Sequence, residues 1–473
     1  MNDHPLHYET ITALSRRIRS GELSPVALTA SLLARIEALN GPLNAFNLVT
    51  EKRALAEARA AETLIQSGRW MGPLHGIPYG VKDIFDVAGL PTSAGSRTLG
   101  ENIAGTDSTV THKLAQAGMI VLGKTITVEF AKGILGINHI QGTPHNPWHR
   151  EAHVPGGSSA GSAVAVASGM APMALGSDTG GSVRAPAGLC GTVGLKTTVG
   201  RISRHGVFPM SWTLDSVGPL TRSVEDAALV YQALQGEDPQ DETTAGVGLH
   251  DALGSLKSGV RGMRIGIPEE LFFDELHPEV DAALNACGDV FRKLGAQVDG
   301  ISFPEAAQVG AMGLISNVEA CVIHEERLRS RLEEMDPVVG MRMLPDLDRP
   351  AIEYVKALRG MKALRASARG NLRDVDVLLV PVTPDPACTV AEADASPEAY
   401  ERLAQRFVRN CRVGNLLDLC GLALPCGFTK DGLPIGLMIY GKPFAEATVL
   451  RAGYAYEQAA GWNSRRPDLS WAV

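Results

Sequence analysis

Hydrophobic residues in the first part of the chain recur with the spacing of an α-helix. Ser24-Pro25 is typical of a helix start, because serine caps the first turn and proline fits its first position. Apolar residues then follow one helical face through 26–39, and Gly41-Pro42 is expected to end the helix. Residues 53–66 are rich in Ala, Arg and Glu and predict a second helix. The pattern therefore predicts a helical N-terminal segment over residues 1–70.

From about residue 74 the pattern changes to short apolar runs that alternate with helical segments. Runs at 77–81 and 119–122 predict buried strands on either side of a helix over 108–117. Residues 263–303 are typical of a strand, a helix and a second strand. This alternation predicts an α/β fold. Since no repeat and no clean boundary interrupts it, we expect one domain over 1–473.

Composition narrows the class of protein. The 473 residues include 44 Lys and Arg against 52 Asp and Glu, a net charge of −8, which disfavours direct binding of nucleic acid or anionic membranes. The N-terminus lacks the charge and apolar core of a signal peptide, and no apolar run reaches a membrane-spanning length of about 18 residues. The seven Cys form no C-x-x-C pair, so neither a disulfide scaffold nor a zinc ribbon is expected. We therefore expect a cytoplasmic enzyme or binding protein.

Glycine is concentrated between residues 156 and 200. This stretch holds 11 of the 51 glycines, about a fifth of them in less than a tenth of the chain. Residues 154–183 contain a single charged side chain, Asp178, so the segment is expected to be buried. Clustered glycine allows the backbone to approach a ligand closely. It also fits a tightly packed sheet with glycine in its turns, and the composition alone leaves both interpretations open.

Two catalytic motifs match the sequence without their structural context. Residues 118–125 (GMIVLGKT) fit the phosphate-loop pattern, but their variable positions are typical of a buried strand and a helix precedes them. Residues 157–161 (GSSAG) fit a nucleophile elbow around Ser159, but a polar segment rather than a strand precedes them. No S-x-x-K and no H-E-x-x-H occurs, so a penicillin-binding pair and a zincin site are unsupported.

Ser182 lies in a context that suits a nucleophile. The sequence Asp178-Thr179-Gly180-Gly181-Ser182 offers several backbone N–H groups with little side-chain bulk. A turn there can direct these donors at one point, which is the requirement for an oxyanion hole. A serine hydroxyl is a weak nucleophile at neutral pH and still needs a base.

Lys82 is the candidate base because it ends an apolar run. Burial in apolar surroundings lowers the pKa of a lysine and makes its neutral amine available. The alternative is a surface lysine paired with Asp83 or Asp86. For Lys82 taken alone, this alternative is favoured.

Together these residues resemble the amidase signature family. The resemblance is carried by 154–198, whose Gly/Ser-rich sequence matches the family nearly throughout, and by GIPYGVKD at 76–83. Residues 214–228 add to it, and weaker similarity occurs in 376–384 and 415–441. The resemblance covers most of the chain. It implies a mixed, mostly parallel central β-sheet flanked by helices, with a signature core over 74–235 and the remaining sheet and substrate funnel over 263–473.

The resemblance also implies roles for individual residues. Ser182 would be the nucleophile, Ser158 the bridging serine after a cis peptide bond, and Lys82 the terminal base. An oxyanion hole would be formed by the N–H groups of Thr179, Gly180, Gly181 and Ser182. Supporting roles would fall to Ser159, Asp178 and Arg184. No metal and no cofactor is implied.

The implied activity is hydrolysis of carboxamides, extending to aryl esters, anilides or carbamates (urethanes), through an acyl-enzyme on Ser182. The partner would be a small-molecule acyl substrate, and the chain a monomer or homodimer. The alternative is a glutamine-hydrolysing A subunit of a tRNA-dependent amidotransferase, and a third possibility is a scaffold without activity. The intact Lys82, Ser158 and Ser182 argue against the scaffold.

A few positions depart from the family pattern or suggest the pocket. Ala160, Thr197 and Ile84 stand where glycine, proline and asparagine are common, and they weaken the amidotransferase assignment. Met210 and Trp212 suggest a bulky apolar pocket wall, although core packing is an equally good explanation. By analogy with the family, residues 125–150 and 305–350 are expected to line the substrate funnel.

Overall fold

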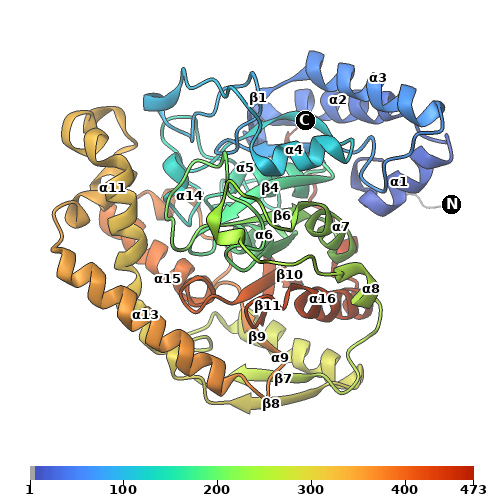
Figure 1. The fold of residues 1–473 in the computed structure, drawn as a ribbon. Coiled ribbons are helices and arrows are strands. Elements are labelled where there is room, and N and C mark those ends of the chain that lie inside the picture. The colour runs from blue at the N-terminus through green and yellow to red at the C-terminus, as the bar shows by residue number, and fades with distance from the viewer. Residues whose placement is uncertain (1–5, 473) are drawn as a thin grey trace.

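The computed structural model describes residues 6–472, apart from the side chain of Asn463. Its centre is one sheet of eleven strands in the order β1-β3-β2-β4-β6-β5-β10-β11-β9-β7-β8 (Figure 1). The strands are β1 (Phe46–Val49), β2 (Pro78–Lys82), β3 (Ile120–Thr125), β4 (Met173–Asp178), β5 (Val193–Lys196), β6 (Ser216–Thr221), β7 (Arg264–Pro268), β8 (Gln297–Ile301), β9 (Val377–Pro381), β10 (Cys420–Phe428) and β11 (Pro434–Gly441).

The sheet is mixed, as expected, but it is not mostly parallel. Of the strand pairs within residues 6–472, those of β2 with β3 and β4 and those of β7 with β8 and β9 are parallel, and the others are antiparallel. The physical reason is visible at β10 and β11, which are joined by residues 429–433 alone. So short a connection permits only an antiparallel pair, because a parallel pair needs a crossover of a dozen or more residues.

Helices cover the sheet and extend from its ends. They are α1 (Ile11–Arg19), α2 (Pro25–Leu43), α3 (Glu51–Gln66), α4 (Thr109–Gln116), α5 (Ala160–Ala167), α6 (Arg184–Cys190), α7 (Val224–Leu234), α8 (Ala252–Leu256), α9 (Pro278–Lys293), α10 (Glu305–Gln308), α11 (Leu314–Ser330), α12 (Pro337–Met343), α13 (Ala351–Asn371), α14 (Val390–Ala393), α15 (Pro397–Leu416) and α16 (Glu446–Ala460). In Figure 1 the N-terminal helices α1–α3 lie at the opposite side of the molecule from α11 and α13.

The N-terminal segment is helical as predicted, with two differences. Ser24 caps α2 by accepting a hydrogen bond from Ala27 N at 3.1 Å, but α2 continues past Gly41-Pro42 to Leu43. The helix ends where Asn44 takes the left-handed conformation, with φ of 50°. The short edge strand β1 was not predicted, since four residues carry too little periodicity to be recognised.

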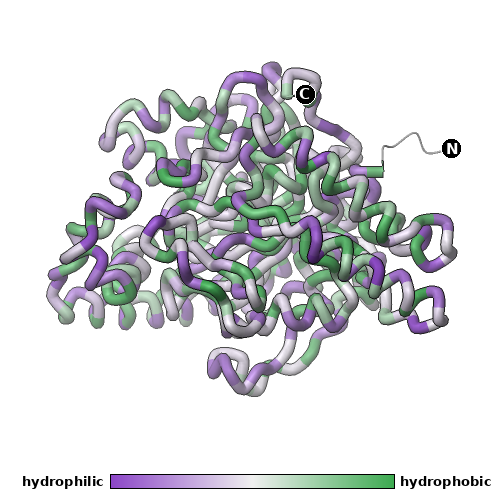
Figure 2. The backbone as a smooth tube through the Cα atoms, turned by 90° about the horizontal axis from the view of Figure 1, so that it is seen from above, coloured by the Kyte–Doolittle hydropathy of each residue, from purple (hydrophilic) through white to green (hydrophobic). Residues whose placement is uncertain are grey.

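The outer helices alternate between hydrophilic and hydrophobic residues along their length (Figure 2). By contrast, every residue of α5 is buried. Its small side chains allow close packing: a Cβ added at Gly161 would lie 2.2 Å from the carbonyl oxygen of Ala45. Tight packing is therefore the correct explanation for part of the glycine-rich stretch.

The segment with the phosphate-loop pattern is structural. Its residues 120–125 form β3, which is buried throughout, and α4 precedes it. Lys124 from this pattern makes a buried ion pair with Asp83, at 2.8 Å between Nζ and Oδ1. The prediction that this segment is a buried strand and not a phosphate loop is confirmed.

One stretch of the described chain, Glu305–Ser330, is long and apolar enough to cross a membrane by length and composition alone, which is weak evidence for a span. A 3-10 turn (Val309–Met312) separates α10 from α11 within it. Gly310, Gly313 and Leu314 from this stretch line a cavity of the protein.

Candidate active site

Lys82, the last residue of β2, is completely buried and takes part in no ion pair within residues 6–472. Its Nζ forms hydrogen bonds with Ser158 Oγ at 2.8 Å and Ser177 Oγ at 2.9 Å. Burial lowers its pKa to about 7, although the charges of Asp178 and Asp215 act in the opposite direction. A lysine in this position has an available neutral amine near neutral pH.

The interpretation of Lys82 as a surface residue paired with Asp83 or Asp86 is wrong. The Asp83 carboxylate is bound by Lys124, and Asp86 accepts a hydrogen bond from Thr92 at 2.8 Å. Because neither carboxylate contacts the Lys82 amine, that amine is left to the two serine hydroxyls.

The sheet explains why Lys82 and Ser177 meet. Strands β2 and β4 are parallel neighbours, with Val81 opposite Leu175. Lys82 and Ser177 therefore lie at the carboxyl ends of adjacent parallel strands, the edge of an α/β sheet where ligands commonly bind.

Ser158 is completely buried and follows a cis peptide bond between Gly157 and Ser158, as the family resemblance implied. Its carbonyl oxygen accepts hydrogen bonds from Val128 N at 3.2 Å and Thr127 Oγ1 at 3.0 Å. These bonds tie the serine to the segment that follows β3.

The turn that carries Ser182 is built around Asp178. The Asp178 carboxylate accepts hydrogen bonds from Gly181 N at 2.8 Å and Val183 N at 3.1 Å. Arg184 binds the same carboxylate in a two-point pair, with Nε–Oδ2 and Nη2–Oδ1 distances of 2.9 Å. Burial acts to raise the Asp178 pKa, but the Arg184 charge and these hydrogen bonds hold it well below its usual range. This buried ion pair fixes the turn.

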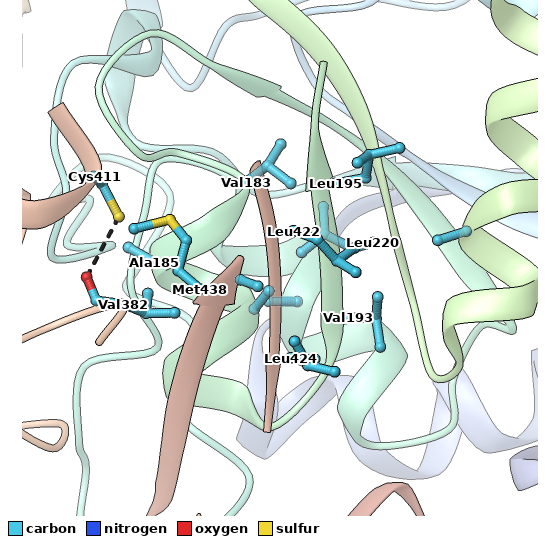
Figure 3. Close-up of a cluster of buried hydrophobic side chains, with 14 of the residues drawn as sticks. Val183, Ala185, Val193, Leu195, Leu220, Val382, Cys411, Leu422, Leu424 and Met438 are labelled. Atoms are coloured by element: carbon cyan, nitrogen blue, oxygen red, sulfur yellow. Dashed lines mark hydrogen bonds between the residues drawn. The ribbon is translucent and has the colours of Figure 1, made fainter. Parts of the chain in front are cut away.

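Arg184 is itself fixed by residues from the C-terminal part of the chain. Its guanidinium donates to Asn415 Oδ1 at 2.7 Å and to Tyr440 Oη. On either side of it, Val183 and Ala185 belong to a cluster of buried apolar side chains from α6 and neighbouring strands (Figure 3). The predicted supporting residues Asp178 and Arg184 thus shape the backbone beneath Ser182.

Ser182 lines a cavity of about 660 Å³ together with Thr179 and Gly180. Its carbonyl oxygen accepts a hydrogen bond from Ser159 N at 3.3 Å, which joins the two serine-bearing segments. Within the described chain no hydrogen bond links the hydroxyls of Ser158 and Ser182. Catalytic hydrogen bonds are often long before substrate binds and shorten in the complex.

The predicted oxyanion hole needs one correction. The Gly181 N–H is already donated to Asp178, so it is not free to bind an oxyanion. The N–H groups of Thr179, Gly180 and Ser182 have no hydrogen-bond partner in the part of the chain that the structure describes. Gly181 serves a conformational role instead: its φ is 130°, and an added Cβ would lie 2.5 Å from Cys411 Cβ.

Ser159, the serine of the nucleophile-elbow pattern, is buried at the start of α5. Its Oγ donates a long hydrogen bond of 3.4 Å to the Ser177 carbonyl oxygen, and it lines neither of the two larger cavities. Sequence reasoning gave no role to Ser177, Asn415 or Tyr440. Ser177 was visible only as one of several serines in the glycine-rich stretch.

A second cavity, of about 210 Å³, lies beside the first. Val207, Phe208, Met210 and Trp212 line it, together with Thr179, which also lines the larger cavity. Trp212 is 45% exposed, so the expectation of an apolar pocket wall holds and core packing does not explain this tryptophan.

One group among residues 6–472 could hold a metal ion. His149, Glu151 and His153 offer ligand atoms within 4.8 Å of one another. None of the three lines the cavity that contains Ser182. A reaction without metal or cofactor remains a prediction.

Replacing Arg184 is expected to destabilise the fold strongly. Arg184→Met leaves the Asp178 carboxylate buried without its cation, which typically costs about 3–5 kcal/mol. Urea unfolding followed by circular dichroism measures the change. Arg369→Met, at an exposed position of α13, is the control and should change stability by less than about 0.5 kcal/mol. Equal stability of the two variants would contradict a structural role for the pair.

Comparisons with known proteins agree with this geometry. A family model described as Amidase matches residues 27–450. The A subunit of the glutamyl-tRNA(Gln) amidotransferase from Geobacter sp. strain M21 is 36% identical, covering 97% of this chain and 99% of that protein. A solved structure described as revealing the origins of an s-triazine catabolic enzyme has a TM-score of 0.90 at 32% identity, over 97% of this chain and 100% of its own.

The native peptide amidase of Stenotrophomonas maltophilia has a TM-score of 0.85 at 30% identity, over 98% of this chain and 100% of its own. The single-domain α/β architecture with a large mixed sheet is thus shared with known enzymes of this kind. With a family match over most of its length and a relative similar from end to end, the chain belongs to the amidase family.

Proposed function

We propose that this protein cleaves the C–N bond of a carboxamide through an acyl-enzyme on Ser182. The observation that carries the proposal is the buried Lys82 amine, which makes no ion pair among the described residues and lies 2.8 Å from the Ser158 hydroxyl. Serine needs a neighbouring base to become a nucleophile, and a lysine with a pKa of about 7 can provide one.

The proposed reaction moves one proton along two hydroxyls. Neutral Lys82 accepts a proton from Ser158, which takes one from Ser182, while Ser182 Oγ attacks the carbonyl carbon. The oxyanion is bound by the free N–H groups of Thr179, Gly180 and Ser182. The proton then returns to the nitrogen of the leaving amine, the C–N bond breaks, and an ester on Ser182 remains. Water attacks this ester by the same route and releases the acid.

Ser177 has a positioning role in this scheme. A neutral amine has two N–H donors and one lone pair. By accepting one N–H of Lys82, Ser177 directs the lone pair of Nζ toward Ser158. The same hydroxyl provides a partner for the protonated amine at the tetrahedral stage.

The curated relatives favour an amidotransferase component over a general amidase. Relatives 36–37% identical over nearly the whole chain carry the name of the A subunit of glutamyl-tRNA(Gln) amidotransferase. In that interpretation the amide is glutamine and the chain works with partner subunits, so a complex replaces the predicted monomer or homodimer. The similarity to a peptide amidase supports the other interpretation, in which the isolated chain hydrolyses amides, anilides, esters or carbamates.

Assays of the isolated chain separate these interpretations. A panel of amides, anilides, aryl esters and carbamates, with acyl groups of increasing size, is followed by release of acid. Turnover without partners supports the hydrolase, and turnover of glutamine only after addition of partner subunits supports the amidotransferase. Absence of turnover in both settings, by folded protein, would contradict the proposed function.

A further inference from the structure

The larger cavity is lined by more cationic groups than anionic ones. Four cationic side chains and two carboxylates face it: Lys132, Arg342, Arg349 and Arg412 against Asp346 and Glu401. Both carboxylates already have partners. Arg342 Nε binds Glu401 at 2.7 Å, and Arg349 binds both Asp346 and Glu353. Two cations, Lys132 and Arg412, therefore have no carboxylate partner within residues 6–472.

Lys132 is an unusual place for a positive charge. The residue is only 6% exposed, and the hydrogen bond of its Nζ goes to the amide oxygen of Asn317 on α11. An ammonium group has three donors, so two remain for a ligand in the cavity. Burial and the nearby charges of Arg342 and Arg412 lower the pKa of Lys132 to about 7, while Asp346 and Cys321 act in the opposite direction. Without an anion, the charged form is disfavoured at this site.

The segment that carries Lys132 is connected to the segment of Ser158, and Lys132 lines the same cavity as Ser182. The preceding residues Phe130 and Ala131 both have positive φ, of 52° and 59°, a conformation that is costly for residues other than glycine. Two residues after Lys132, the carbonyl oxygen of Ile134 accepts a hydrogen bond from Gly157 N at 2.7 Å. The segment that carries Lys132 is thus bound directly to the segment that carries Ser158.

Arg412 approaches the cavity from α15. Its guanidinium donates to the side-chain amide of Gln405 at 3.3 Å and makes no ion pair in the described part of the chain. The guanidinium lies close enough to Lys132 to lower the lysine pKa. Such a pair of cations is stabilised when a carboxylate binds between or beside them.

We propose that the amide substrate carries a carboxylate, bound by Lys132 and Arg412, and carries no ammonium group. The first part follows from the two unpaired cations, and the second from the absence of an unpaired carboxylate among the described residues that line the cavity. The inference rests on the amide cleavage proposed above and specifies its substrate class. It disfavours free glutamine, whose α-amine would be an unpartnered cation.

The proposal is tested with three ligands: glutaramate, pentanamide and glutamine. Pentanamide and glutamine each differ from glutaramate at one group. Glutaramate is glutamine without its α-amine, and pentanamide has the same chain length without the carboxylate. Binding is measured by calorimetry to Ser182→Ala, so that no turnover is required. Glutaramate is expected to bind at least tenfold more tightly than pentanamide and than glutamine. Adding Lys132→Met should reduce this advantage at least tenfold, whereas adding Lys362→Met, at an exposed lysine of α13, should preserve it.

A second readout distinguishes an ion pair from a packing effect. At pH 8, binding of glutaramate to Ser182→Ala should be accompanied by proton uptake, detected as a dependence of the binding enthalpy on buffer ionisation. Lys132→Met should reduce the uptake, and the facing groups Arg342, Arg412, Asp346, Glu401 and Cys321 are unchanged in that variant. Arg412→Gln, which keeps a polar side chain, should weaken glutaramate binding in the same direction, and thermal melting checks that each variant folds.

The outcomes separate this proposal from the proposed function. The carboxylate site is overturned if pentanamide or glutamine binds as tightly as glutaramate. It is also overturned if the advantage of glutaramate survives Lys132→Met. Lys132-dependent binding of glutaramate by a protein that cleaves no amide supports the carboxylate site and contradicts the amide cleavage.

Discussion

Ser182→Ala is expected to lower kcat/KM by about 10⁵-fold on the best amide or ester of the panel. The variant loses the only hydroxyl of the proposed reaction that faces the large cavity, and removal of a serine nucleophile has effects of this order in other acyl-transfer enzymes. The residual rate would come from binding and from the backbone N–H groups of Thr179, Gly180 and residue 182, which the substitution leaves in place. Steady-state kinetics give the rates, and circular dichroism confirms that the variant is folded.

Ser168→Ala is the matched control for this prediction. Ser168 is completely buried, and it ends α5 with a hydrogen bond to the Val164 carbonyl oxygen, away from the cavity. Its loss should change kcat/KM by less than about threefold. If Ser182→Ala kept activity within tenfold of the unmodified protein, the nucleophile would have to be another residue.

Lys82→Ala should have the second largest effect, a loss of at least about 10³-fold in kcat/KM. The unmodified protein should show kcat/KM rising with pH through an apparent pKa of about 7. The sign follows from the role: below that pH the amine is protonated and cannot accept a proton from Ser158, and above it the amine is free. Lys82→Ala should lose this rise, and a small primary amine added to the assay should restore part of the activity.

Lys113→Met controls for the loss of a half-buried lysine whose pKa is also shifted. Burial lowers the pKa of Lys113 as well, but its Nζ binds the carbonyl oxygens of Leu234 and Gln235 and does not reach either cavity. Its pH profile should match that of the unmodified protein. A pH profile unchanged in Lys82→Ala would show that another group is the base.

The sequence predicted the residues of the candidate site more fully than it predicted which side chains they contact. Lys82, Ser158 and Ser182 were identified because they stand in long segments with a recognisable pattern, and the local sequence also indicated burial around them. The alternative partner of Lys82 was the adjacent Asp83, because sequence neighbours are the only partners that a sequence displays. The structure assigns Asp83 to Lys124, and this requires β3 to lie beside β2, with Val81 opposite Lys124.

Other features depended on contacts between distant segments. The bond of Gly181 N–H to Asp178 arises because Arg184, Asn415 and the turn share one carboxylate, and 231 residues separate Arg184 from Asn415. The proportion of parallel strands was predicted wrongly for a similar reason. Alternating strands and helices in the sequence predict that a sheet forms. The order and direction of its strands depend instead on which strands and helices pack against one another.

The larger cavity is lined by two stretches of chain that have different roles. The reacting groups all come from residues 82–182, whereas much of the opposite wall comes from the helices between 310 and 416. Mutations in those helices can change which molecules are accepted while the proton path stays intact. A lineage of such proteins can thus evolve new preferences through changes in one half of the gene, and exchange of that half between relatives is a practical route to altered selectivity.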